Sequence, residues 1–214
     1  MEHLSEASKV KNKHRDMLME SFFKKNSILV NGMVITPVAA FANTLENAVT
    51  LSVSFSIITL FTLLFSSFVP KRVVYAIRII IYTVIGSLIY VVAAILLNHL
   101  MPDKIADMGI YFPLLIINSL IVSRSEVIFS RERRSVVLID IIFCILGYAI
   151  VVLLFGVIRE ILGSGGIGNH VLAVPVIYPV FRTTFGGFLL LGMFAALYRA
   201  VLLFVKRLKE TGVK

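Results

Sequence analysis

The sequence predicts an all-α membrane protein of six transmembrane helices, arranged as two inverted repeats of three. Hydrophobic residues make up 58% of the 214 residues and charged residues only 15%, and the mean hydropathy is +0.95. These values lie well outside the range of soluble domains. Six stretches without Asp, Glu, Lys or Arg approach or reach the roughly 20 residues that cross a bilayer. They are 26–45, 47–70, 79–102, 108–123, 141–158 and 183–198.

Two of these stretches, the first and the fourth, carry a proline near the expected middle of the membrane. Proline leaves backbone groups unpaired at bilayer depth, and such breaks are tolerated where protein or a site satisfies them. With three helices per half, the second half takes the opposite orientation, and inverted repeats with broken helices place sites near the midplane. The predicted midplane site comprises Pro37, Asn43, Pro113 and Asn118.

The second and third stretches are uninterrupted. Small residues at every second position open the second one, from Ala48 to Ser54, which favours close packing against the broken helices. Glu46 stands alone in the turn before this stretch. Its carboxylate is interpreted either as part of an outer vestibule on an ion path or as a solvated loop group.

The fifth stretch contains the most informative charges. Asp140 is a carboxylate near its start, and a carboxylate inside a membrane segment indicates a cation or proton relay. Pairing with Arg133 or Arg199 is the alternative. Arg159 and Glu160 at its far end are interpreted as a local ion pair rather than an ion gate. A glycine-rich external loop, 159–182, leads to the sixth stretch.

Positive charge predicts the orientation. With a cytoplasmic N-terminus, sixteen of the 21 lysines and arginines lie inside, in segments 1–25, 71–72, 124–134 and 206–214. Three lie outside: Lys104, Arg159 and Arg182, while Arg78 and Arg199 snorkel from helix ends to the inner face. Both termini are therefore predicted to be cytoplasmic in a multi-pass prokaryotic inner-membrane protein. The expected division is a basic segment 1–25, repeats 26–102 and 103–206, and a tail 207–214.

Cysteine and histidine usage argues against catalysis by this chain alone. Cys144 is the single cysteine, so an internal disulfide and a cysteine-only metal site are excluded. The four histidines are scattered over the tail and loops, and no serine or cysteine occupies a nucleophile motif.

The chain resembles the paired six-helix membrane subunits of the Rnf electron-transport complex and the sodium-translocating NADH:quinone reductase, most closely the RnfE and NqrD proteins. Three motifs carry the resemblance: NSILVNGMVITP at 26–37, MGIYFPLLIINSLIVSRSE at 108–126, and REILG at 159–163. It covers roughly residues 26–168.

The resemblance implies one cysteine in each broken helix, which joins two from a sister subunit to hold a mid-membrane iron–sulfur cluster. Thr36 and Ser119 occupy those positions here, and a hydroxyl is no substitute for the thiolate that such clusters require. This chain is therefore expected to bind no cofactor alone, and a shared [2Fe-2S] cluster is not expected. Flavins and iron–sulfur clusters are expected on partner subunits.

The resemblance thus implies a membrane subunit of a redox-driven ion pump, one that scaffolds rather than carries a cluster. Its expected partners are an RnfA- or NqrE-like sister subunit of inverted topology and the other redox subunits, within the lipid bilayer and without nucleic acid. The alternative is a transporter of a small solute or ion, or a membrane anchor, that reuses the fold without redox chemistry.

Overall fold

Helices make up almost all of the regular structure in this computed structural model, which describes residues 34–70, 72–116, 119–128, 134–168, 170–171 and 178–211. The long helices are α3 (Leu45–Ser66), α4 (Tyr75–Leu100), α7 (Arg134–Ser164) and α8 (Thr184–Thr211). The shorter ones are α2 (Ile35–Phe41), α5 (Pro102–Met108), η2 (Gly109–Tyr111), η3 (Pro113–Leu115), α6 (Ser119–Ile128) and η4 (Pro179–Arg182). The predicted all-α class is confirmed.

Among the described residues, four helices are long and apolar enough to cross a membrane: Leu45–Ser66, Tyr75–Leu100, Leu138–Ser164 and Thr184–Phe204. A fifth span results if the helix pair Pro102–Tyr111 and Pro113–Ser123, bent by 64°, is counted as one. The predicted break at Pro113 is therefore present. Most of the first predicted span, 26–45, lies outside the described residues, and α2 is the part of it that the structure describes. The chain is a multi-pass membrane protein.

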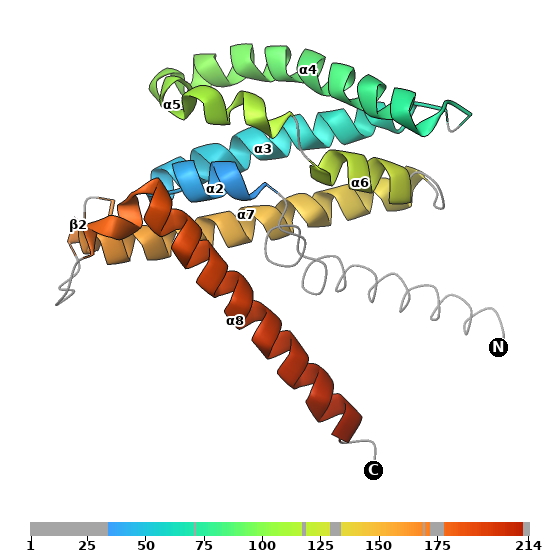
Figure 1. Cartoon of the computed structure of the whole chain (residues 1–214). Coiled ribbons are helices and arrows are strands. Elements are labelled where there is room, and N and C mark those ends of the chain that lie inside the picture. Colours follow the sequence, from blue (N-terminus) through green and yellow to red (C-terminus); the bar gives the residue numbers. More distant parts are fainter. Residues whose placement is uncertain are drawn as a thin grey trace, which may run out of the picture.

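Helix α3 is the centre of the bundle. It contacts α2, α4, α5, α6 and α7, and Figure 1 shows it between the layer of α4 and α5 and the layer of α6 and α7. Its contact with α7 is close because Gly156 has no side chain, and a Cβ there would lie 2.5 Å from the Cβ of Ala48. The sequence predicted close packing of these small residues against the broken helices, whereas Ala48 makes its close approach to the uninterrupted α7.

Helix α8 packs by its first turns alone and then angles away from the bundle (Figure 1). Its main contacts are with α2 and η4. Many large apolar side chains on α4 and α8 stay exposed, as expected where lipid or a membrane partner takes the place of water. The buried core instead lies along α3 and α7, where Leu51, Phe55 and Val152 are fully buried.

The loop after α7 begins later than the predicted boundary at Arg159, because the helix continues to Ser164. Beyond it, β1 (Gly166–Ile167) and β2 (His170–Val171) form a two-residue antiparallel ladder. The glycine-rich segment thus supplies a tight hairpin, with positive φ at Gly165 and Gly168. The η4 turn then leads the chain into α8.

Candidate functional site

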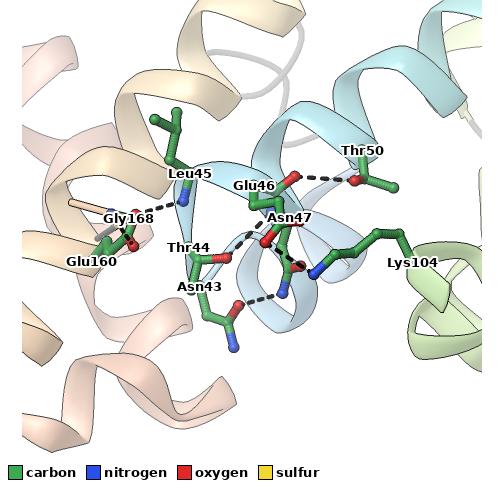
Figure 2. A network of polar contacts seen from close by, with 9 residues as sticks. All are labelled: Asn43, Thr44, Leu45, Glu46, Asn47, Thr50, Lys104, Glu160 and Gly168. Atoms are coloured by element: carbon green, nitrogen blue, oxygen red, sulfur yellow. Dashed lines mark hydrogen bonds and ion pairs between the residues drawn. The ribbon is translucent and has the colours of Figure 1, made fainter. Parts of the chain in front are cut away.

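The turn between α2 and α3 carries a polar network that ties several elements together (Figure 2). Thr44 caps α3 by accepting a hydrogen bond at 3.2 Å from the backbone N–H of Asn47. The Asn47 side-chain amide donates to Oδ1 of Asn43 at 2.8 Å. Asn43, a residue of the predicted midplane site, therefore lies in this turn and helps to order it.

Glu160 completes the amino end of α3 from a distant part of the sequence. Its Oε2 accepts from the backbone N–H of Leu45 at 2.8 Å, and its Oε1 accepts from that of Gly168 at 2.9 Å. The residue is 8% exposed. A carboxylate at a helix amino end satisfies an orphan N–H group and faces the positive end of the helix dipole. Glu160 thus joins α3 to the hairpin after α7.

Arg159, the neighbouring residue, binds carbonyls instead. It is fully buried, and its guanidinium carries five N–H donors in a planar fork. Nη1 donates to two carbonyls at the carboxyl end of α2, at 2.8 and 3.0 Å. Nε and Nη2 donate to three carbonyls around the η4–α8 turn, at 2.9 to 3.4 Å. The five acceptors belong to Ala39, Ala42, Phe181, Arg182 and Thr183.

The predicted ion pair between Arg159 and Glu160 is therefore wrong. Adjacent residues of a helix point in directions about 100° apart and do not face each other. Each side chain instead hydrogen-bonds to backbone groups at a helix end whose partial charge is opposite to its own. Arg159 donates to a carbonyl at the carboxyl end of α2, and Glu160 accepts from a backbone N–H at the amino end of α3. We call this arrangement the α2–α3 clasp: Arg159, Glu160 and the backbone groups that they bind.

Glu46 is not the isolated carboxylate that the sequence suggested. Its side chain is 70% exposed, and its Oε2 lies 3.0 Å from Nζ of Lys104 in α5. A cavity of about 270 Å³ opens beside this pair. It is lined by Glu46, Val49, Thr50, Met101, Pro102, Asp103 and Lys104. An exposed pair of this kind contributes little to the stability of the fold. Its position beside the cavity is therefore of more interest for function than its energy.

A second ion pair joins α4 to α6. Nη2 of Arg78 lies 2.6 Å from Oε2 of Glu126, and the hydroxyl of Tyr82 donates to Oε1 of Glu126 at 3.2 Å. Arg78, which was predicted only to snorkel to the inner face, thus has a carboxylate partner within the protein. The pair fixes α6, the second half of the bent span, against the uninterrupted α4.

The segments that carry the two prolines lie together, because α2 contacts η2. Pro37 is buried on α2, and Pro113 begins η3. Thr36 is exposed in the first turn of α2, and Ser119 begins α6. Asn118 lies outside the described residues. The structure thus places α2 beside the bent segment without testing the side-chain site predicted between them.

These residues do not fit an iron–sulfur cluster. Thr36 and Ser119 offer hydroxyls, and the single thiol, Cys144, is buried on α7 rather than on either broken segment. Among the described residues no group of three His, Cys, Asp or Glu side chains could hold a metal ion. Asp140 is partly buried near the start of α7, and its role in an ion path stays a prediction.

Replacing Glu160 by alanine is expected to lower the free energy of unfolding by about 2–3 kcal/mol, because two backbone N–H groups lose their acceptor. Glu160→Gln should fall between alanine and wild type, since one carbonyl oxygen remains. Cys144 is 5% exposed, so its reaction with a fluorogenic maleimide on heating reports unfolding.

The matched control is Glu46→Gln, whose carboxylate is 70% exposed and should contribute less than about 1 kcal/mol. Equal unfolding curves for the Glu160 and Glu46 variants would contradict the structural role of Glu160.

Comparison with known proteins identifies relatives along most of the chain. Residues 14–198 match the family described as "Rnf-Nqr subunit, membrane protein". A protein of Pasteurella multocida, named as the E subunit of an ion-translocating oxidoreductase complex, is 30% identical over 155 residues, which cover 71% of this chain and 67% of that protein. Proteins of the same name from Sodalis glossinidius and Shewanella oneidensis are each 28% identical, over 72% and 71% of this chain and 66% of their own length.

Proposed function

Because this chain belongs to the Rnf-Nqr family of membrane proteins, we propose that it is an integral membrane subunit of an ion-translocating oxidoreductase complex. The match along residues 14–198 is the observation that carries the proposal. The four apolar helices of spanning length in the described part of the chain agree with it. The chain spans about two thirds of the length of the relatives it matches, so the activity of the complex is part of the proposal.

Within that complex the chain pairs with a sister subunit of inverted topology. The proposed arrangement is six spans in two inverted repeats, with both termini in the cytoplasm of a prokaryotic cell. The contact of α2 with η2 supports it, since each belongs to one of the two interrupted segments. The α2–α3 clasp supports it as well. The buried backbone groups where α2 ends and α3 begins need donors and acceptors from elsewhere in the protein, and Arg159 and Glu160 supply them.

The chain scaffolds this region rather than carrying electrons. Thr36 and Ser119 stand at the positions where the family resemblance implies cluster cysteines, and neither is a cluster ligand. Flavins and iron–sulfur clusters therefore belong to partner subunits. Glu46 beside its cavity and Asp140 on α7 are the carboxylates proposed for an ion path.

Purification of the tagged full-length chain from its native membranes tests the assignment. The expected result is a complex with flavin- or iron-bearing subunits, detected by protein identification, flavin fluorescence and iron content. A homodimer that purifies without a redox partner would overturn the proposal and favour a transporter or anchor that reuses the fold.

Thr36→Val and Ser119→Ala are expected to leave the iron content and visible spectrum of the purified complex unchanged, because neither hydroxyl binds iron. The measurement is iron per complex, normalised to flavin. Stoichiometric iron that disappears in either variant would show that the hydroxyl side chains take part in a metal site. Such a result would leave the assignment to the complex intact.

A further inference from the structure

The hydroxyl groups in the amino-terminal half of α3 all have partners: Ser54 donates to Sδ of Met108 at 3.9 Å, and the others bond within the helix. Those of Thr50, Ser52 and Ser56 each donate to the carbonyl four residues earlier, at 3.0, 2.8 and 2.6 Å. This local bond is the usual way for a helical serine or threonine to satisfy its hydroxyl in an apolar setting. The amino-terminal half of α3 therefore follows the expected pattern.

The carboxyl-terminal part of α3 does not follow this pattern of local hydroxyl bonds. Thr59, Thr62 and Ser66 are fully buried, and in the part of the chain that the structure describes their hydroxyl oxygens have no hydrogen-bond partner. Their spacing of three and four residues puts them on one face of the helix. At 1.5 Å per residue the row extends about 10 Å inward from Ser66, the last residue of α3.

Helices packed against α3 add two hydroxyls of the same kind. Ser125 on α6 is 2% exposed, Tyr148 on α7 is 1% exposed, and neither hydroxyl has a partner among the described residues. The Tyr148 ring stacks on Phe55 with centroids 3.7 Å apart, one helical turn before Thr59. On the side of α4, Thr62 faces Gly86, which has no side chain, and a Cβ built there would lie 3.8 Å from the Thr62 hydroxyl oxygen.

Five unpartnered hydroxyls on three neighbouring helices are costly in a dry interior. Internal water is the usual way in which buried groups of this kind are satisfied where the protein gives them no partner. We propose that α3, α6 and α7 enclose a hydrated polar track. It enters at the α3–α4 turn, passes Ser66, Thr62 and Thr59, and ends at the stacked rings of Phe55 and Tyr148.

Single cysteines test for water along the track. Ser66→Cys, Thr62→Cys and Thr59→Cys are made in full-length chain with Cys144→Ala and probed in membrane vesicles with a small charged methanethiosulfonate. Only a thiolate reacts, and a thiol ionises in water rather than in an apolar interior. The expected rates fall in the order 66, 62, 59, with even the slowest about tenfold faster than that of Ser54→Cys, a fully buried control.

Vesicles of both orientations show from which side the reagent arrives, and Arg72→Cys in the exposed α3–α4 turn marks that side. The three cysteines are expected to react from the same side as position 72. Rates at 59, 62 and 66 no faster than at Ser54→Cys would overturn the proposal.

Thr62→Val gives a second, independent readout, because it shifts the unfolding temperature in opposite directions for a hydrated site and for a dry site. If water bonds to the hydroxyl, the nearly isosteric valine loses that bond, and the unfolding temperature falls by about 2–4 °C. If the site is dry, valine removes an unsatisfied group and raises the unfolding temperature, which would also overturn the proposal. Ser52→Ala, where the hydroxyl bonds to its own helix, serves as the control.

Discussion

Replacing Arg159 by methionine is expected to lower the unfolding temperature by about 10 °C, which corresponds to a loss of about 4 kcal/mol. Methionine keeps much of the apolar length of the side chain but removes all five N–H donors. Buried carbonyls of α2 and of the η4–α8 turn then lose their partner inside a membrane protein, where each unsatisfied group costs free energy. The contact of the guanidinium with the Phe155 ring, 5.4 Å from its centroid, is lost as well.

Arg159→Lys should fall between wild type and methionine. Its ammonium keeps the positive charge but has three donors on one atom, and it cannot reach carbonyls on two sides of a planar fork. The unfolding curves of all these variants are measured by the reaction of the buried Cys144 with a fluorogenic maleimide during heating. Arg72→Met, at an exposed arginine in the α3–α4 turn, is the matched control and should change the midpoint by less than about 2 °C. An Arg159→Met midpoint equal to that of the Arg72 variant would refute the clasp.

The sequence was sufficient to predict the long helices and the break at Pro113. Uncharged runs of spanning length become α3, α4, α7 and α8, and Pro113 marks the bend because its ring and missing N–H interrupt the interior of a helix. These features depend on hydropathy and on the backbone chemistry of single residues, which the sequence states directly. The prediction of the all-α class therefore did not require any knowledge of packing.

The clasp could not be predicted in the same way. Arg159 and Glu160 are adjacent in sequence, which suggested a mutual pair, whereas their partners are backbone groups up to 120 residues away. Backbone carbonyl acceptors and N–H donors recur along the whole chain, so no side-chain pattern identifies the ones that Arg159 and Glu160 bind. The indication of the clasp in the sequence was the REILG motif, in which two adjacent charged residues end an apolar run. Likewise Glu46 and Lys104 are far apart in sequence, and the contact between α3 and α5 brings them together.

Gly187 is the position where the clasp tolerates no added atom. A Cβ there would overlap the carbonyl oxygen of Ala39 and lie 2.9 Å from Cζ of Arg159. The carbonyl is backbone and cannot turn aside, so Gly187→Ala must push α8 away from α2 and lengthen the bonds of Arg159. The expected cost is about 3 kcal/mol, or about 6–12 °C in the unfolding temperature measured through Cys144.

Gly192→Ala, the same substitution five residues along α8, is the matched control. A Cβ at Gly192 meets nothing within 4 Å, so the midpoint should stay unchanged or rise slightly through better helix propensity. Because a Cβ at position 187 would lie 2.9 Å from Cζ of Arg159, the two sites should also couple. In an Arg159→Met background the guanidinium is absent and its bonds are already lost, so Gly187→Ala should cost clearly less than in wild type. Gly192→Ala should have the same effect in both backgrounds. Full additivity of Gly187→Ala with Arg159→Met would mean that the glycine acts on α8 packing alone, and that the arginine holds α2 independently of it.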